Sequence, residues 1–355
     1  MINIIDNIEK LDVFRDEWCR LFRMDTDASP FQSFEYVKAS IEFCKHESGK
    51  LYIICIKDDP TNQWIAIFPL ILNSNGILTY INYKHTDFCL PIVAPQYNNY
   101  NTYKELSEYI LSNKGISGIL WDNITPNSQL LSVLKPHFRY SIVNDINYFS
   151  SIVINKQPGD KDSIDSFRYV KAKQRKNLRK TFSKISDTCV LEICSKSTGQ
   201  SYPEKQISLL INKMVSDGIR KKCYFSDSMQ NFWRHLYDKD VLTVALISEN
   251  GKVESANFMY YDNKQNQYIK WIMLYMDNTW NMKINLMIAD YLYNNGGATI
   301  NFARGIYDYK MVNFHPDVKP LFCLKVSKTK WGHLKNIINT AFHYFKPVIK
   351  SWLGR

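Results

Sequence analysis

The segment of residues 266–310 has the clearest succession of secondary-structure signals in the chain. Residues 268–275 are rich in β-branched, aromatic and other apolar side chains, which predicts a strand. Asp277, Asn278 and Thr279 form a cluster typical of a helix N-cap, and apolar residues then recur at three- and four-residue spacing, which predicts a helix over 280–295. Phosphates bind where a helix begins after a strand, because its free N–H groups and its dipole favour anions.

The end of this segment concentrates glycine and charge. Gly296 and Gly297 end the predicted helix, and residues 298–302 predict a short buried strand that leads into a charged turn. In that turn Gly305 permits close approach of the backbone, and Arg304 offers a planar fork for a phosphate or a carboxylate. The alternative is a purely structural turn, in which Arg304 forms an ion pair within the protein and binds no ligand.

Composition predicts a globular protein with an anionic partner. The 355 residues suffice for two domains that each bury a core, and 45% of them are hydrophobic. The 45 Lys and Arg residues against 34 Asp and Glu residues give a net charge of +11. This balance favours a phosphate-bearing cofactor, nucleic acid or an acidic membrane face.

The cysteines and the apolar runs predict a soluble cytoplasmic protein. The eight cysteines contain no C-x-x-C pair, which favours buried reduced thiols. Residues 1–10 lack the apolar core of a signal peptide, and the longest apolar run, residues 64–72, is far shorter than the roughly 20 residues of a membrane span.

Helix and strand patterns occur in a similar order in both halves, which predicts an α+β chain with two tandem domains of one type. We expect domains over 1–150 and 151–330, joined through the linker-like residues 155–160, and a C-terminal helix over 331–355. The Asn250-Gly251 pair predicts a tight hairpin between two strands of the second domain. A strand over 63–72 and a long helix over 163–185 are also expected.

The predicted helix over 163–185 is strongly basic. It contains Arg175 and Arg179 among many lysines, with no acid between Asp165 and Asp187. Two interpretations stay open: a solvated outer face, or a surface that binds an anionic substrate or the phosphates of a cofactor. Nucleic-acid binding is a third interpretation, which the absence of a zinc-finger or RNP pattern from the sequence weakens.

Motifs for metal and hydrolytic chemistry are absent from the sequence. The seven histidines are isolated, and there is no G-x-S-x-G, P-loop or H-E-x-x-H pattern. Acyl transfer from an activated thioester needs no metal, because the protein mainly positions and desolvates the reactants. We therefore expect this chemistry and no metal ion.

Several motifs resemble the CelD-like branch of the GNAT acyltransferase superfamily, which is associated with cellulose and other polysaccharides and is similar to Fem-type tandem transferases. The five segments that carry this resemblance, over roughly residues 28–326, are 29–33 with Tyr36, 64–70, 87–92, 175–179, and 302–305 with Tyr309-Lys310. The resemblance implies two tandem GNAT-like domains, each with a mixed, mainly antiparallel sheet. It also implies acetyl-CoA or another acyl-CoA as co-substrate.

The chain departs from the family pattern at two places. Ile306 and Tyr307 stand where the family often has acids. The small, glycine-containing entry to the cofactor helix is replaced by residues 280–283, where Lys283 is the remaining phosphate partner.

The resemblance implies a site in the C-terminal domain. The strand over 266–275 would pair with the pantetheine amides, and backbone N–H groups beside it would stabilise the thioester oxyanion. Tyr309 would donate a proton to the leaving thiolate. The expected catalytic residues are Arg304, Tyr309 and Lys310; the expected cofactor-binding residues are Trp271, Met273, Asn281 and Lys283; the expected substrate-binding residues are Asp87, Arg175 and Arg179.

The function expected from these features is transfer of an acetyl or other acyl group to an amine of an amino sugar or a polysaccharide precursor. One alternative is a Fem-type transferase that uses aminoacyl-tRNA, and another is a non-catalytic protein that recognises a glycan or a membrane-bound synthase. The amphipathic, basic helix over 331–353, which Pro347 should kink or split, either packs over the second domain or lies on an acidic membrane face.

Overall fold

The chain forms two compact units. The computed structural model describes residues 1–44, 49–185, 187–277 and 279–352, with side chains as far as Ala341. The first unit contains Met1–Asn147 and Pro320–Arg355, and the second contains Tyr148–Lys319. Residues 320–330, expected in the second domain, thus group with the first unit. Asn278 of the expected N-cap and residues 353–355 of the expected C-terminal helix lie outside the described residues.

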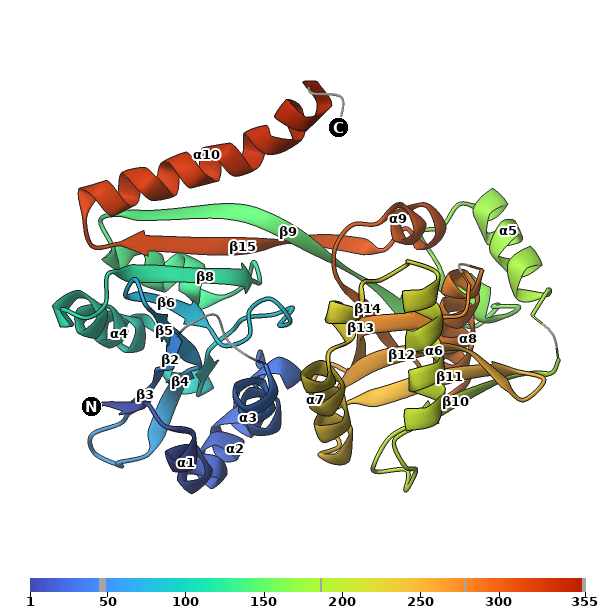
Figure 1. The fold of residues 1–355 in the computed structure, drawn as a ribbon, viewed down its shortest axis with the longest axis horizontal. Helices are drawn as coiled ribbons and strands as arrows, with labels where there is room; N and C mark the ends of the chain where they lie inside the picture. The colour runs from blue at the N-terminus through green and yellow to red at the C-terminus, as the bar shows by residue number, and fades with distance from the viewer. Residues whose placement is uncertain (45–48, 186, 278, 353–355) are drawn as a thin grey trace. The chain divides into compact units, whose positions relative to one another are not determined.

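The first unit is built from helices around two groups of strands (Figure 1). Its helices are α1 (Ile8–Leu11), α2 (Arg15–Met24), α3 (Phe34–Phe43), α4 (Tyr100–Ser112) and α10 (Lys330–Trp352). Its strands are β1 (Ile2–Ile5), β2 (Gly49–Leu51), β3 (Ile53–Lys57), β4 (Trp64–Phe68), β5 (Leu70–Asn73), β6 (Ile77–Tyr80), β7 (Ile92–Val93) and β8 (Gly118–Ile124). Strands β9 (Ser141–Ile154) and β15 (Asp317–Ser327) have residues in both units.

The strands of the first unit belong to two sheets. One has the order β1-β3-β4-β7, and in the other β15, β8, β6, β5 and β2 are consecutive neighbours. The expected strand over 63–72 is wrong: it is two strands, β4 and β5, in different sheets. Pro69 stands between them, and proline cannot donate the N–H that an unbroken ladder needs.

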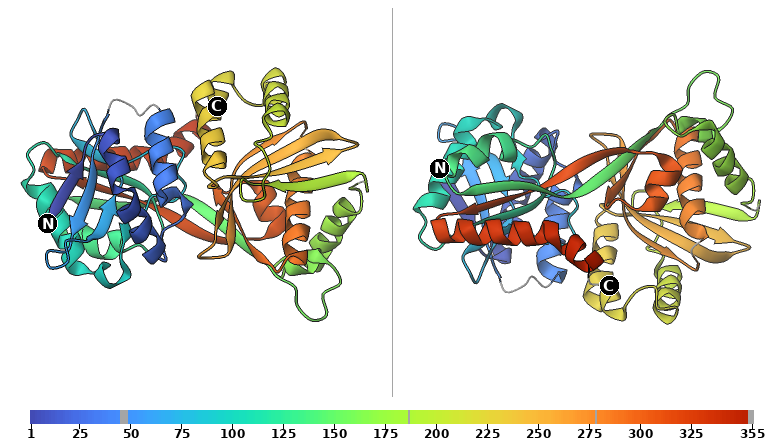
Figure 2. Two further views of the ribbon diagram at one scale, coloured as in Figure 1. Left: turned by 90° about the horizontal axis from the view of Figure 1, so that it is seen from below. Right: turned by 90° about the horizontal axis from the view of Figure 1, so that it is seen from above.

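The second unit has one mixed, mainly antiparallel sheet with helices on both faces (Figure 2). Its sheet order is β10 (Cys189–Cys194), β11 (Thr243–Glu249), β12 (Lys252–Asp262), β13 (Gln267–Tyr275), β14 (Ala298–Arg304) and the end of β9. Helices α6 (Glu204–Ser216) and α7 (Asp227–Asp238) cover one face, and α5 (Ala172–Phe182) and α8 (Trp280–Asn294) cover the other. A short helix, α9 (Asp308–Phe314), occupies part of the expected charged turn.

The expected continuous helix over 163–185 is also wrong. The segment contains a 3-10 turn over Ser163–Ser166 and then, after a break, helix α5. The side chain of Arg168 explains the break, because its guanidinium pairs with Asp160 (Nη2 to Oδ2, 2.6 Å) and donates to the carbonyl of Asn155 at 3.3 Å. These contacts tie the segment back to the linker-like residues before it.

Helix α10 is a single helix over Lys330–Trp352, so the expected interruption at Pro347 does not split it. None of the described helices is long and apolar enough to cross a membrane.

Candidate active site

Strand β13 loses its second neighbour part-way along its length. It pairs with β12 from Gln267 to Tyr275, but with β14 only from Gln267 to Ile269, in parallel register with Thr299–Asn301. Beyond Ile269, the described residues provide no strand on this edge of β13. The expected edge for ligand amides is therefore present.

Irregularities in both strands accompany this parting. Phe258 pairs with Ile272 and Met259 with Lys270, so Trp271 is an extra residue of β13. In β14 the register with β9 shifts between Asn301 and Arg304, and Ala303 has a φ of 55°. Bulges bend a strand, and a non-glycine residue in the left-handed region costs on the order of 1 kcal/mol or more.

Lys310 holds the end of β14 in place. Its side chain is buried, and its ammonium donates to the carbonyl of Phe302 at 2.7 Å and to that of Gly305 at 3.1 Å. The same ammonium lies 4.9 Å from the ring centroid of Tyr307. Lys310 thus places a positive charge where β14 turns away from β13.

Tyr309 and Arg304 accompany Lys310 at this end of β14. Burial raises the pKa of the Tyr309 phenol to about 12, so it keeps its proton at neutral pH. Its ring stacks on that of Tyr307, with centroids 6.1 Å apart. Arg304 is half-buried at the last ladder position of β14, opposite Phe149. The three expected catalytic residues therefore lie on one short segment, β14 to α9.

Lys270 is a candidate site residue that our sequence analysis did not name. It is the first residue of β13 beyond the ladder with β14, it is only 8% exposed, and its ammonium donates to Asn285 Oδ1 on α8. Burial, together with the positive charge of Lys310, lowers the pKa of Lys270 to about 7. No carboxylate among the described residues forms an ion pair with it. A lysine inside an apolar strand was the signal that could have identified it.

Buried polar atoms without partners line the same region. Neither amide atom of Asn257, which pairs with Met273 across the ladder, has a hydrogen-bond partner in the described part of the chain. Asn281 Oδ1, in the first turn of α8, also has none. Buried amides are normally satisfied, so such orphans indicate a place for water or a ligand. The amide-bearing arm of a pantetheine fits this lining.

The start of α8 does not fit a pyrophosphate. The Asp277 carboxylate accepts from the Thr279 N–H at 2.7 Å and from the Thr279 hydroxyl, which lowers the pKa of Asp277. The ammonium of Lys283, expected to face phosphates, lies 4.1 Å from the ring centroid of Trp280 instead. An acid at the helix start repels a phosphate, and no glycine opens this turn.

The side chain of Trp271 points away from α8. It packs with Phe232, Trp233 and Tyr260, at centroid distances of 6.0, 6.4 and 5.4 Å. Of the two expected cofactor residues on β13, only Met273 has its side chain against the core beneath α8. Trp271 can reach a ligand on the open edge through its backbone alone.

Two carboxylates in the segment before α5 neutralise part of the positive charge of this helix. The Arg179 guanidinium pairs with Asp162 at 2.7 Å and with Asp165 at 2.6 Å, and these bonds raise its pKa. An anionic substrate would have to compete with both carboxylates. Arg175 lies one turn earlier, half-buried, and forms no ion pair with a described residue. Asp87, also expected to bind substrate, is buried in the first unit.

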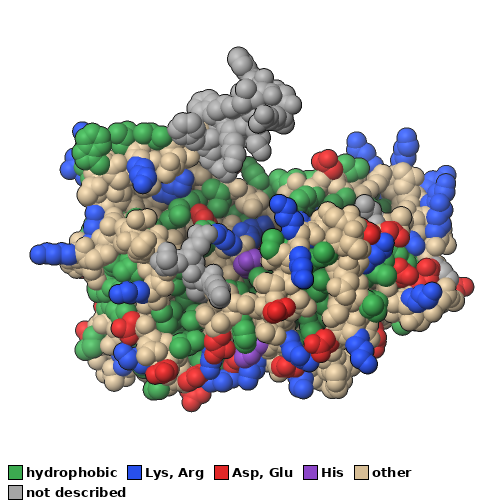
Figure 3. Space-filling view, in the orientation of Figure 1, with side chains coloured by type: hydrophobic (Ala, Val, Ile, Leu, Met, Phe, Trp, Pro, Cys, Tyr) green, Lys and Arg blue, Asp and Glu red, His purple; other side chains and the backbone are tan. Residues whose placement is uncertain are grey.

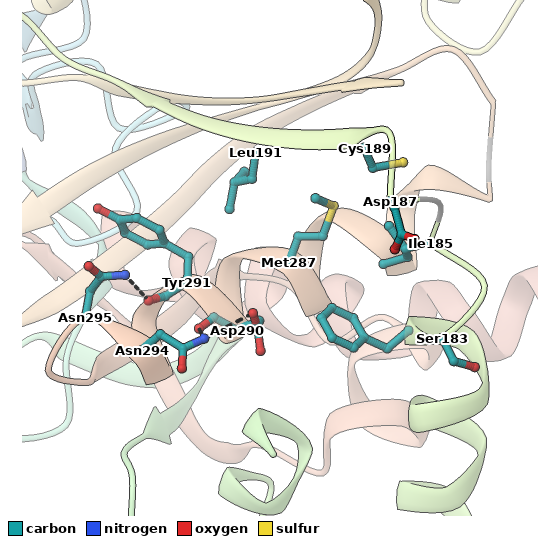
Figure 4. A pocket seen from close by; sticks show the side chains of 11 residues that line it. Ser183, Ile185, Asp187, Cys189, Leu191, Met287, Asp290, Tyr291, Asn294 and Asn295 are labelled. Carbon is teal, nitrogen blue, oxygen red and sulfur yellow. Dashed lines mark hydrogen bonds between the residues drawn. The ribbon is translucent and has the colours of Figure 1, made fainter. Parts of the chain in front are cut away.

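A separate pocket of about 570 Å³ lies between the end of α5, β10 and the outer side of α8 (Figure 4). Its lining includes Phe182, Leu191, Met287 and Tyr291, with the carboxylates of Asp187 and Asp290. None of the expected site residues lines it. Among the described residues, no group of three His, Cys, Asp or Glu side chains could hold a metal ion.

Comparisons with known proteins rest on structure. No family model and no curated protein matches the sequence. Among solved structures, L-PGS from Bacillus licheniformis is 9% identical, with a TM-score of 0.57, and the match covers 92% of this chain and 93% of that one. FemX is also 9% identical, with a TM-score of 0.57 and coverage of 91% and 96%. A tandem GNAT protein from the clavulanic acid biosynthesis pathway is 8% identical, with a TM-score of 0.51 and coverage of 93% and 99%.

The chain has a GNAT-type fold. The likeness extends over more than nine-tenths of its length and includes a tandem GNAT protein. In this GNAT-type fold, the parted strands β13 and β14, the first turn of α8 and the β14–α9 segment form the candidate active site.

Proposed function

We propose that the protein is an N-acyltransferase of the CelD-like kind, which transfers an acetyl or other acyl group from acyl-CoA to an amine of an amino sugar or polysaccharide precursor. The open edge of β13 from Lys270 to Tyr275 is the observation that carries this proposal. Peptide-like amides pair with such an edge as an added strand would. An acyl-CoA donor would place the reaction in the cytoplasm.

Acyl-CoA, when bound, would supply an activated carbonyl carbon. Tyr309, which keeps its proton at neutral pH, would donate that proton to the departing thiolate. Lys270, with a pKa of about 7, is suited to accept the proton that the amine loses as the new bond forms. Lys310 and Arg304 would stabilise negative charge that develops beside the end of β14.

Binding and turnover can be tested separately. Isothermal titration with acetyl-CoA should show binding to the wild-type protein, and an assay with acetyl-CoA and glucosamine should yield the acetylated amine. Tyr309→Phe should lower kcat by about 10²-fold, the usual size of one proton-transfer contribution, with little change in acetyl-CoA affinity. Tyr307→Phe is the matched control and should leave kcat within a few-fold, since its hydroxyl has no assigned role.

A folded protein that shows no heat of binding at millimolar acetyl-CoA would contradict the acyl-CoA proposal. Binding without product, together with an Arg304→Ala variant that behaves like wild type, would favour the non-catalytic glycan-binding or synthase-binding alternative.

A second candidate function is transfer from aminoacyl-tRNA, as in Fem-type transferases. The start of α8 favours it, because Asp277 lies beside that start, no glycine opens the turn, and the phosphates of coenzyme A therefore lack their usual cradle there. The exposed lysines of α5, such as Lys173, Lys176 and Lys180, offer contacts for a polyanion. Binding of aminoacyl-tRNA in a filter assay, with an affinity that falls steeply as salt rises, would support this candidate. If the protein retains no tRNA on the filter, or retains it equally at all salt concentrations, this candidate is ruled out.

A further inference from the structure

The side of α10 that faces the protein is the polar side. Lys325 of β15 donates to the Thr340 hydroxyl at 2.7 Å, and the ring of His333 lies 5.5 Å from that of Tyr140. A side chain at Gly332 would collide with Ser327. Small and polar residues therefore make the described contacts between α10 and the first unit.

Four apolar side chains in the described part of α10 face outward. Trp331 is 80% exposed, and Leu334, Ile337 and Ile338 are 44–46% exposed. These four residues, which we call the α10 apolar face, follow helical spacing, and hydrophobic side chains gather over the start of α10 in Figure 3. An amphipathic helix normally buries this side, so the α10 apolar face indicates a partner outside the first unit. The expected packing of the C-terminal helix over the second domain stays a prediction.

The charge of α10 identifies the class of partner. The helix contains Lys330, Lys335, Lys346 and Lys350, and its sequence has no Asp or Glu. Lys330 and Lys335 are exposed beside the α10 apolar face. A second copy of the chain seated on this face would bring two basic helices together, and like charges oppose that arrangement. A bilayer with anionic headgroups satisfies both the apolar side chains and the lysines.

We propose that α10 is an interfacial helix that docks the protein on anionic membranes, with Trp331, Leu334, Ile337 and Ile338 inserted at the boundary between headgroups and acyl chains. The helix lies on the bilayer and does not cross it. This function is independent of the acyl donor, since none of these residues belongs to the candidate active site. It would bring an acyltransferase to substrates held at a membrane.

Co-sedimentation of the full-length protein with phosphatidylcholine vesicles, with and without phosphatidylserine, tests the proposal. The wild type should pellet with the phosphatidylserine vesicles, and the Leu334→Glu/Ile338→Glu double variant should lose about tenfold or more in affinity, because two carboxylates replace inserted apolar groups. Lys330→Gln/Lys335→Gln should reduce the preference for phosphatidylserine several-fold. Val13→Glu, at an exposed apolar residue of the first unit outside α10, is the control and should bind as wild type does.

Circular dichroism checks that each variant is folded, and all substituted positions are at the surface. Absence of wild-type binding to phosphatidylserine vesicles at low salt would overturn the proposal, as would equal loss of binding in Val13→Glu. A wild-type dimer in light scattering that Leu334→Glu/Ile338→Glu converts to a monomer would also overturn it, in favour of a second copy of the chain.

Discussion

Lys270 departs most clearly from what its position in the fold requires. A buried strand residue is normally apolar, and a buried ammonium without a carboxylate partner is costly. Strong departures of this kind concentrate at functional sites, and Lys270 lies where β13 and β14 part. The residue therefore links the stability of the second unit to its proposed chemistry.

The pKa of Lys270 predicts how stability depends on pH. The pKa is about 7 in the folded protein and near 10.5 for an ordinary lysine, so between these values the unfolded chain holds a proton that the folded chain lacks. Unfolding then takes up a proton, and the free energy of unfolding rises with pH over this window. Lys270→Met should be more stable than wild type by on the order of 3 kcal/mol at pH 7, and the gain should shrink towards pH 10.

Urea denaturation of both proteins at several pH values measures this difference. Lys270→Gln is the matched control that keeps a hydrogen-bonding group beside Asn285 without the charge, and it should show the same loss of pH dependence. A gain that is constant from pH 7 to pH 10 would contradict the assigned pKa.

Arg304, Tyr309 and Lys310 were predicted as catalytic residues from one short motif. The structure places them on the segment from β14 to α9, and their roles stay predictions. The engagement of Arg179 with Asp162 and Asp165 was missed, because a continuous helix over 163–185 would have held these acids more than three turns away. The break before α5 brings them back to the guanidinium.

Helix α5 is joined to the segment before it by the ion pairs of Arg179 with Asp162 and Asp165. Arg179→Ala should lower the free energy of unfolding by on the order of 1 kcal/mol, since it removes the guanidinium that joins α5 to two carboxylates, and solvent screens part of the effect. Arg175→Ala, one turn earlier and without an ion pair to a described residue, should change stability by less than about half of that. Thermal melts of the two variants make the comparison. Equal losses of stability in both variants would contradict the structural role of the Arg179 ion pairs.

Elements with local signals were predicted well. Strand β13, helix α8 and strand β14 match the expected order, and the hairpin at Asn250-Gly251 has positive φ at both residues, 51° and 74°. Strand β15 was missed because its partner is distant: Phe322 pairs with Ile124, with no turn between them to indicate the pairing. Helix α9 was missed because it is short and has no side-chain cap.

At the scale of the whole molecule, the C-terminal segment completes the first unit. Residues of β15 such as Leu321, Leu324 and Val326 are buried, and β15 pairs with β8. A chain that ends after Lys319 should fail to form a stable first unit, because it loses this strand and leaves the edge of β8 exposed. A chain that ends after Thr329 lacks only α10 and should melt cooperatively near the wild-type temperature. Calorimetry of both truncated chains checks this, and a normal melt of the shorter chain would show that β15 is dispensable.

The tandem α/β organisation was visible in the order of elements, and the GNAT-type fold confirms the expected fold class. The grouping of residues 320–355 with the first unit could not be seen, since it depends on pairing between strands nearly 200 residues apart.

Hydrogen exchange of the β13 backbone, with and without acetyl-CoA, tests the central claim most directly. The amides of Lys270–Tyr275 that point away from β12 should exchange quickly in the free protein, because no strand of the described residues pairs with this edge. Saturating acetyl-CoA should slow their exchange about tenfold or more, with no comparable change in β11. Unchanged exchange in this segment while acetyl-CoA is bound would contradict the account.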